Sequence, residues 1–527
     1  MRRRRARNLL PALLVPLLAA CAASPPPTAS VAPNGVVIVT AEGSQLFDGD
    51  DQVPPTLDLE VQGQGITPAV VDASLDGRRL SLTSASGGVT AQVPPLVYGS
   101  AHTLVVEVLG QPTQRIGFQV VGRTQVSAAA WLSPSSQLVC QVVFEYAPNQ
   151  AAVAAALPGA ALSWTDTTHL ALSWGSPPAA LTIPAGLPAA FGSVLDGPLT
   201  LSLTGLQAGQ LRRATVPVAA PAPASLPVTL WTVGTSGSDA SVDAHASRAA
   251  VLSPTGWAVG SDGTLQGSPD PVTLRAAATA GRPVWPLLAN DFGDTTATDQ
   301  FLNDAGEESA LVDAVLAQVQ SRHFGGVNLD FENVPGSDEG ALTGFVRELA
   351  AALHGAGAGL SVDVVPHAPG DQNSASAAYD YAAIAAAADQ LVVMTYDEHD
   401  AAGDPGPVAG IDWQAAELAG TLPGVPAAKV VVGVPLYARI WSGADVTASA
   451  YGAAVAQALG EPDVEYGYDF AAATPELSSD PGGVPTQLWF DDADSLLRKI
   501  DAVQGKGFAG IAAWRAGFED PAFWNVI

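Results

Sequence analysis

The sequence predicts a C-terminal (β/α)₈ barrel with a small insertion before its last strand, preceded by two all-β immunoglobulin-like modules. In the first half, short β-branched runs are separated by turn signals such as Asp76-Gly77 and Gly87-Gly88, a texture typical of β-sandwiches. Three prolines between Ala220 and Pro227 mark a boundary. Beyond it, apolar strand-like segments alternate with helical segments, which indicates parallel βα units.

The composition fits a multidomain globular protein and argues against a nucleic-acid partner. The chain has 527 residues, of which 48% are hydrophobic, so each domain can bury a sizeable core. Its formal net charge is -29 and its isoelectric point is about 4.3. Because phosphate binding requires basic patches, we expect no nucleic acid to bind.

Residues 1–21 are predicted to be a lipoprotein signal peptide. Arginines at positions 2 to 5 form a positive region, and the apolar stretch Leu9 to Leu18 is too short to span a bilayer as a mature helix. The stretch ends in Leu18-Ala19-Ala20-Cys21, which resembles a bacterial lipobox. An ordinary signal peptide is the alternative. We expect export and a lipid anchor on Cys21, on the outer side of the cytoplasmic membrane or elsewhere in the cell envelope.

The segment 22–34 is rich in Pro, Ser and Ala and is predicted to be a linker. The two β-sandwich modules are assigned to residues 35–121 and 122–220. Neither shows a cluster of catalytic residue types, so a spacer or binding role is the default. Cys140 lies in an apolar run of the second module and, with Cys21 acylated, has no disulfide partner. It is predicted to be a small buried hydrophobe.

The barrel is assigned to residues 226–527, because eight strand candidates occur there within about 300 residues. The strand candidates are Val228 to Val233, Ala249 to Leu252, Val284 to Leu288, Gly326 to Phe331, Leu360 to Val365, Leu391 to Tyr396, Val430 to Pro435 and Gly510 to Trp514. Helix candidates include Glu307 to Arg322, Glu339 to His354, Ala375 to Ala388 and Asp492 to Val503.

The span Ile440 to Leu488 between the last two strands is too long for a plain connection. It contains Tyr451, Tyr466 and Tyr468. We predict that it holds a helix and a small β insertion, and that it forms one wall of a cleft.

Polar residues at three strand ends are the candidate site. In the fourth strand, Asn328, Asp330 and Glu332 alternate with apolar residues and therefore share one face. Taken alone, this alternation also fits a solvated edge strand. The sixth and eighth strands end in Tyr396-Asp397 and Trp514-Arg515. Because barrel active sites lie at the carboxyl ends of the strands, these groups should meet at one mouth.

Four motifs, in order, resemble glycoside hydrolase family 18. Gly326 to Glu332 resembles the strand-four signature Asp-Gly-x-Asp-x-Asp-x-Glu. Met394 to Asp397, Gly433 to Arg439 and Gly510 to Arg515 match the motifs of strands six, seven and eight. The resemblance covers about Val228 to Ile527 and does not extend to residues 1–225.

Within that family, the chain is most similar to the branch of spore-germination and cortex-lytic N-acetylglucosaminidases. That branch shows Gly-Val-Asn-x-Asp-Phe-Glu, then Tyr-Asp-Glu-His and a Trp-x-x-Gly-x-Glu-Asp ending. The latter two correspond here to residues 396–399 and 514–520. The chain departs from the wider family at Gly325, where an Asp is frequent, and at Asn328, which replaces the middle Asp. Asn328 can hydrogen-bond Asp330 but cannot share a proton with it, so the titration of Asp330 should differ from that in a chitinase with both carboxylates.

The resemblance implies that Glu332, Asp330 and Tyr396 are catalytic. Glu332 would protonate the glycosidic oxygen, Asp330 would orient the acetamide of the sugar, and Tyr396 would bind the acetamido oxygen. Asp397 would bind a sugar hydroxyl or Glu332, and Trp514 would be the floor under the pyranose. The remaining predicted substrate-binding residues are Asn328, Met394, Tyr437 and Arg439. No metal or other cofactor is expected, and the histidines lack ligand spacing.

The function that this resemblance implies is retaining, substrate-assisted hydrolysis of β-1,4 bonds that follow N-acetylglucosamine units. Peptidoglycan is the preferred polymer and chitin the second. The expected partners are such a polysaccharide and a membrane reached through the lipid anchor, and the chain is expected to be a monomer. One alternative is a chitolectin-like surface lipoprotein that binds glycans with little or no catalysis. Another is a scaffold whose β-modules bind a partner.

Overall fold

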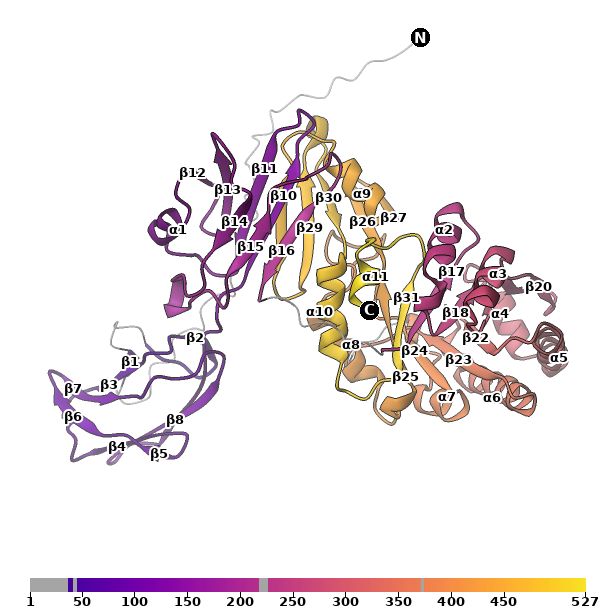
Figure 1. The fold of residues 1–527 in the computed structure, drawn as a ribbon. Coiled ribbons are helices and arrows are strands. Elements are labelled where there is room, and N and C mark those ends of the chain that lie inside the picture. The colour runs from indigo at the N-terminus through magenta and orange to yellow at the C-terminus, as the bar shows by residue number, and fades with distance from the viewer. Residues whose placement is uncertain (1–36, 41–44, 218–225, 371–373) are drawn as a thin grey trace, which may run out of the picture. The chain divides into compact units, whose positions relative to one another are not determined.

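The computed structural model describes residues 37–40, 45–217, 226–370 and 374–527. The chain divides into two compact units, residues 1–122 and 123–527 (Figure 1). The predicted signal peptide with Cys21 and the linker at 22–34 lie outside the described residues. Among the helices that are described, none is both long and apolar enough to cross a bilayer.

The first unit is a two-layer β-sandwich. One sheet has the order β1-β3-β7-β6 and the other β2-β9-β8-β4-β5. Alternate residues of both sheets, such as Val61 and Phe118, meet in one apolar core. The immunoglobulin-like character stays a prediction. The strands are β1 (Val37–Thr40), β2 (Asp50–Val53), β3 (Asp58–Gln62), β4 (Val71–Leu75), β5 (Arg78–Arg79), β6 (Leu82–Ala85), β7 (Gly88–Gln92), β8 (Ala101–Val108) and β9 (Gln114–Val120).

The second unit begins with another β-module, whose five-stranded sheet has the order β12-β13-β11-β10-β16. A two-stranded sheet, β14-β15, packs on it around a shared apolar core that contains the free Cys140. The elements are β10 (Val126–Leu132), β11 (Leu138–Phe144), α1 (Gln150–Ala156), β12 (Ala160–Trp164), β13 (His169–Trp174), β14 (Ala180–Ile183), β15 (Leu199–Ser202) and β16 (Arg212–Val216).

Eight parallel strands close the barrel, and each overlaps a predicted strand. They are β17 (Val228–Thr232), β18 (Val251–Pro254), β21 (Leu287–Ala289), β22 (Gly326–Asp330), β23 (Gly359–Val364), β24 (Gln390–Val393), β25 (Val430–Pro435) and β31 (Gly510–Trp514). A parallel bridge between Leu252 and Val284 joins β18 to the chain entering β21 and closes the ring. The short hairpin of β19 (Trp257–Val259) and β20 (Leu265–Gly267) extends it beside β21.

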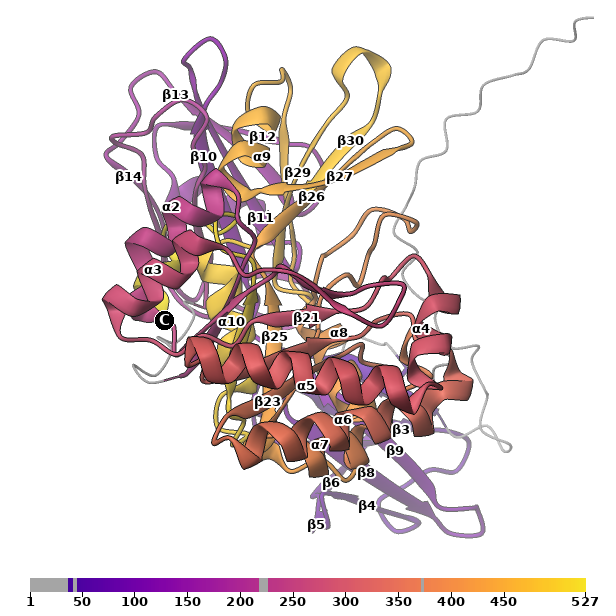
Figure 2. The ribbon, with the colours of Figure 1, turned by 90° about the vertical axis from the view of Figure 1, so that its right-hand side faces the viewer.

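Helices cover the outside of the barrel, and Figure 2 shows α5, α6 and α7 side by side along one flank. Three predicted helices are confirmed within two residues, whereas the one predicted from Ala375 begins only at Tyr381, where the Asp380 side chain caps it. The helices are α2 (Ser236–His245), α3 (Pro271–Ala280), α4 (Thr295–Leu302), α5 (Ala305–Arg322), α6 (Glu339–Gly355), α7 (Tyr381–Ala387), α8 (Ile411–Thr421), α10 (Ala493–Val503) and α11 (Phe523–Val526).

The insertion before the last strand is an antiparallel sheet with one helix, as predicted. Its order is β27-β26-β30-β29-β28. The elements are β26 (Tyr437–Ser442), β27 (Asp445–Ala450), α9 (Tyr451–Ala458), β28 (Glu465–Asp469), β29 (Thr474–Ser479) and β30 (Thr486–Trp489).

This insertion packs against the β-module of the second unit. Along β10, Ala128 and Ala130 face the module's own core, whereas Ala129 and Trp131 face the insertion, where they meet Leu477. Both faces of β10 are therefore buried, which explains why its sequence is almost continuously apolar. The module is therefore joined to the barrel's insertion by a shared apolar core, and its role as a spacer or binding module stays a prediction.

Arg213 on β16 holds the module to the barrel by polar contacts. Its Nε and Nη2 both donate to the carboxylate of Asp492 at 2.8 Å, and its Nη1 donates to Tyr466 Oη on the insertion at 3.2 Å. Tyr466 also shares a 2.6 Å hydrogen bond with Ser127 on β10. Burial would raise the pKa of Asp492, but the charge of Arg213 and the hydrogen bonds from it and from Ser495 lower that pKa below its ordinary value. The ion pair is nearly inaccessible to solvent, with the Arg213 side chain only 3% exposed.

Candidate active site

The strand β22 carries the centre of the site. It is buried on both sides: Val327 and Leu329 pack against the helices, while Asn328 and Asp330 face the interior of the barrel. Ala289 on β21 and Asp363 on β23 are the register partners of Asp330, so they lie at the same level of the barrel. Polar side chains on an inward strand face are expensive to bury without hydrogen bonds or function.

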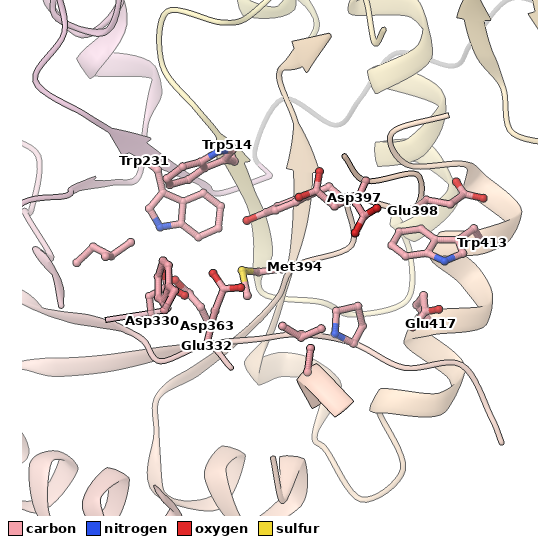
Figure 3. Close-up of a pocket in the computed structure, with 17 residues that line it drawn as sticks. Trp231, Asp330, Glu332, Asp363, Met394, Asp397, Glu398, Trp413, Glu417 and Trp514 are labelled. Carbon is pink, nitrogen blue, oxygen red and sulfur yellow. The ribbon is translucent and has the colours of Figure 1, made fainter. Parts of the chain in front are cut away.

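A cavity of about 620 Å³ opens at the carboxyl end of these strands (Figure 3). Trp231 and Trp514 lie together on one side of it, above the group formed by Asp330, Glu332 and Asp363. The residues that line the cavity are Trp231, Leu287, Phe292, Asp330, Glu332, Asp363, Val365, Pro366, Ala375, Met394, Tyr396, Asp397, Glu398, Asp400, Trp413, Glu417 and Trp514. Seven of them are carboxylic acids and none is lysine or arginine.

Glu332 stands just beyond β22, on backbone that two other residues hold in place. The Asn290 side chain accepts from the Glu332 N–H at 2.9 Å and donates to the Glu332 carbonyl at 2.8 Å. Tyr379 Oη donates to the carbonyl of Phe331 at 2.7 Å. These three hydrogen bonds fix where the Glu332 side chain leaves the main chain, which a general acid requires.

The electrostatic environment suits an acid. Burial and the negative charge of Asp397 both raise the pKa of Glu332 above its ordinary value. Burial, followed by the charge of Glu332, raises the pKa of Asp330 well above its usual range. A raised pKa keeps a carboxyl group protonated to higher pH, so Glu332 is suited to donate a proton to a leaving group.

Asn328 does not bond to Asp330, contrary to the expectation from sequence. Its Oδ1 accepts from Trp231 Nε1 at 2.7 Å and from Ser253 Oγ at 3.1 Å. Its Nδ2 donates to Ser361 Oγ at 3.0 Å and to Asp363 Oδ1 at 2.7 Å. Because an indole N–H can only donate, this network fixes which end of the amide faces Asp363.

Tyr437 and Arg439 lie one layer behind the cavity. Both donate to Oδ1 of Asp397, the arginine from Nη2 at 2.6 Å. Neither is among the lining residues, and both are more than nine-tenths buried. The structure therefore places them as supports of Asp397 rather than on the surface that a sugar would touch. Asn328 is likewise 1% exposed and lies beneath the cavity.

Aromatic side chains supply flat apolar surfaces in the cavity. Trp231 and Trp514 contact edge-to-face, with ring centroids 5.6 Å apart. At the opposite end of the cavity, Trp413 lies beside Glu398 and Glu417 (Figure 3). Phe292 is 40% exposed and also lines the cavity.

Six predicted site residues line the cavity together, namely Asp330, Glu332, Met394, Tyr396, Asp397 and Trp514. Sequence reasoning missed Asn290, Asp363 and Trp413. Asp363 carried a usable signal, since it stands near the carboxyl end of the predicted strand Leu360 to Val365. The insertion contributes no residue to this cavity, so the prediction that it forms a wall of the cleft is not matched here. Within the described ranges, no cluster of His, Cys, Asp or Glu is arranged to hold a metal ion.

Comparison with known families agrees with this geometry. Residues 291–519 match the model of "Glycosyl hydrolases family 18". This part of the chain is a glycosyl hydrolase family 18 domain. The match spans β22 to β31 and includes Glu332, Tyr396 and Trp514.

Relatives of the family 18 domain include proteins whose names refer to sporulation and to the lysis of cortical fragments. The chain is 31% identical over 227 residues to YdhD of Bacillus subtilis, which is named as a sporulation-specific glycosylase, covering 42% of this chain and 54% of that protein. It is 28% identical to the cortical fragment-lytic enzyme of Bacillus cereus, covering 50% of this chain and 64% of that protein. The chain thus spans between half and two thirds of these relatives.

A solved structure shares the fold. The chitinase from Chromobacterium violaceum ATCC 12472 superposes with a TM-score of 0.54 at 28% identity, covering 57% of this chain and 98% of that one. The family 18 domain therefore has a chitinase-like barrel, and the family is one of glycoside hydrolases.

Proposed function

We propose that this protein hydrolyses β-1,4 glycosidic bonds that follow N-acetylglucosamine units, in peptidoglycan first and chitin-like glycans second. The observation that carries the proposal is the position of Glu332. It has a raised pKa, its backbone is clamped by Asn290, and it stands at the mouth of a barrel beside a second carboxyl group and two indoles. Relatives named for cortex lysis support peptidoglycan as the preferred polymer.

In the proposed reaction, the Glu332 carboxyl gives its proton to the glycosidic oxygen as the bond from that oxygen to the anomeric carbon breaks. The acetamido carbonyl oxygen of the same sugar attacks the anomeric carbon, forming an oxazolinium ion and retaining configuration after water attack. The Glu332 carboxylate then takes a proton from that water. The Asp330 carboxylate accepts a hydrogen bond from the acetamide N–H, and its charge stabilises the cation.

The cavity favours an uncharged stretch of glycan. Its seven carboxylic acids would repel lactyl or peptide carboxylates of a wall polymer lying within it, since like charges in a partly buried site are destabilising. N-acetylglucosamine is neutral and presents an apolar ring face to Trp514. We therefore place N-acetylglucosamine in the catalytic subsite and expect charged branches of the polymer to remain outside the cavity.

The test uses the purified full chain, because removal of the β-module would expose the apolar face of the insertion around Leu477 and Phe490. The protein is incubated with peptidoglycan and, separately, with N-acetylchitooligosaccharides, and the products are analysed by mass spectrometry. We expect new reducing ends at N-acetylglucosamine, retained anomeric configuration, and loss of activity in Glu332→Gln. Glu339→Gln, an exposed carboxylate at the start of α6, is the matched control.

Residual activity of Glu332→Gln within a few-fold of the unchanged protein would overturn the assignment of the acid. The rival function, glycan binding without catalysis, predicts saturable binding of the same oligosaccharides with no new reducing ends. A passive barrel with binding β-modules predicts glycan affinity that does not change in Trp514→Ala. Each outcome is distinguishable in the same set of assays.

A further inference from the structure

A second carboxyl group lies next to Asp330. It belongs to β23, whereas the family motif would place it on the fourth strand, at the position of Asn328. Asp363 on β23 is the register partner of Asp330 on β22, and both side chains line the cavity. Asp363 is 1% exposed and Asp330 is 7% exposed. Oδ1 of Asp330 and Oδ2 of Asp363 are both buried, and neither has a hydrogen-bond partner among the residues that the structure describes. Two neighbouring buried carboxyl groups that each lack a donor are stabilised when one of the two is protonated.

Asn328 determines which oxygen of Asp363 is left free. Because Trp231 and Ser253 occupy its Oδ1, its Nδ2 must point toward Asp363, where it donates to Oδ1. Oδ2 of Asp363 is therefore the oxygen available for a proton. The uncharged Asn328 thus orients the carboxyl group of Asp363 on the neighbouring strand.

We propose that Asp363 is a positioning residue that holds the proton shared by the Asp330–Asp363 pair, so that Asp330 presents the single negative charge of the pair to the substrate acetamide. The inference rests on the proposed function for its catalytic consequence. The proton stays on Asp363 throughout the cycle, while the proton that cleaves the bond comes from Glu332 and returns to it from water. The proton balance of hydrolysis is therefore unchanged.

The surroundings of Asp363 favour its neutral form. Burial and then the charge of Asp330 raise its pKa well above the ordinary range, the hydrogen bond from Asn328 acts in the opposite direction, and Glu332 raises it further. Tyr396 also lies close to Asp363, since burial and then the charge of Asp363 raise the pKa of its hydroxyl. No lysine or arginine lines the cavity among the residues described, so no cation is positioned there to let both carboxylates ionise.

The proposal predicts different kcat values for Asp363→Asn and Asp363→Ala, whereas a purely structural role predicts no such difference. In Asp363→Asn, the amide oxygen can accept from Asn328 while its NH₂ takes the place of the O–H and donates to Asp330. In Asp363→Ala, that donor is lost. We expect kcat to fall on the order of 100-fold in Asp363→Ala, the size of effect seen when a catalytic proton is misplaced, and to recover most of that loss in Asp363→Asn, with KM little changed in either.

A second readout needs no substrate. Because the pKa of Asp363 is raised in the folded protein, its contribution to stability is present at low pH and is lost as pH rises through the folded-state pKa. The melting temperature of the unchanged protein should therefore fall with rising pH more steeply than that of Asp363→Asn. Asp389→Asn is the control, since Asp389 lies at the opposite end of the barrel and accepts from the N–H of Leu360 at the start of β23.

The kcat values and the melting profiles can each support or overturn the proposal. Rescue by asparagine, together with a flatter melting profile for Asp363→Asn than for Asp389→Asn, supports the proposal. An equal loss of kcat in Asp363→Asn and Asp363→Ala would overturn the proposal, because activity would then depend on the charge of Asp363 and not on the proton that it holds. Wild-type kcat in Asp363→Ala would overturn it too. If the unchanged protein hydrolyses no glycan, the proposed function fails, while the melting profile still tests the shared proton.

Discussion

Asn290 and Glu332 are joined by two reciprocal hydrogen bonds, in which the asparagine side chain pairs with both the N–H and the carbonyl of the glutamate. Asn290 is buried just after β21, and Thr298 on α4 accepts from the same Nδ2 at 3.0 Å. The backbone of the proposed acid is thus anchored to a neighbouring strand end rather than only to its own.

Removal of this clamp should lower turnover without unfolding the protein. In Asn290→Ala, we expect kcat to fall about 10- to 100-fold, because small misplacements of a catalytic group have effects of that size. KM should change little. Steady-state kinetics on an N-acetylchitooligosaccharide measures both. Asn303→Ala is the matched control, since the Asn303 side chain donates to Asp299 and Asp338 and does not line the cavity. An unchanged kcat in Asn290→Ala would show that Glu332 is positioned by other contacts.

The charge of Asp397 should set part of the pH profile. Burial and Asp397 together raise the pKa of Glu332, so the protonated acid persists to higher pH, and activity is lost as pH rises through that pKa. In Asp397→Asn one of the two causes is removed, and the released Arg439 adds positive charge nearby. The alkaline limb of kcat/KM should therefore move to lower pH.

Measurement of kcat/KM against pH for both proteins tests this shift. Asp404→Asn changes a carboxylate of the same loop that does not line the cavity and should leave the limb in place. A shift of the limb to higher pH in Asp397→Asn would contradict the assignment of that limb to Glu332.

The buried ion pair between Arg213 and Asp492 should matter for stability. In Arg213→Met, the carboxylate of Asp492 would remain buried without its partner, and removal of one member of a buried pair typically costs about 3–5 kcal/mol. The free energy of unfolding, from denaturant titration, measures the loss. Arg123→Met removes an exposed ion pair with Asp196 and should cost no more than about 1 kcal/mol. Equal losses in the two variants would show that the pair does not join the module to the barrel unit.

Glu476 predicts a pH dependence of stability at the same junction. It lies on β29 in a pocket shared with β11 and β13 of the module, and burial followed by the charge of Asp469 raises its pKa to about 7. Its folded pKa is above the unfolded value, so its stabilising contribution is complete at low pH and is lost as pH rises through about 7. Glu476→Gln should therefore show a smaller fall in melting temperature between acidic and alkaline buffer. A parallel fall in the two proteins would contradict this.

The barrel and most of the cavity could be predicted from sequence for a physical reason. A barrel strand is covered on both faces, so it reads as a short apolar run, and a polar residue in such a run marks the interior or the mouth. This logic located Asp330 and Glu332 on the fourth strand and Tyr396 beyond the sixth. Applied to the fifth strand, it would also have singled out Asp363.

Other parts of the site depend on contacts that no periodicity encodes. Asn290 acts through the backbone of a residue 42 positions away, and Trp413 reaches the cavity from α8 rather than from a strand end. The role of Asn328 depends on Trp231 and Ser253, which hold its amide in one orientation. The packing of the module against the insertion could not be predicted for a related reason. A strand buried on both faces, such as β10, shows no alternation of polar and apolar residues that would indicate a second partner.

The two-sided burial of β10 also constrains how this architecture can be inherited or rebuilt. One face of β10 packs in the module's own core and the other packs against the barrel's insertion. A substitution on the outer face of β10 would therefore require a compensating substitution in the insertion. A chimaera that grafts this module onto another barrel would have to bring β26 to β30 along with it. The module and the insertion would therefore have to be exchanged together.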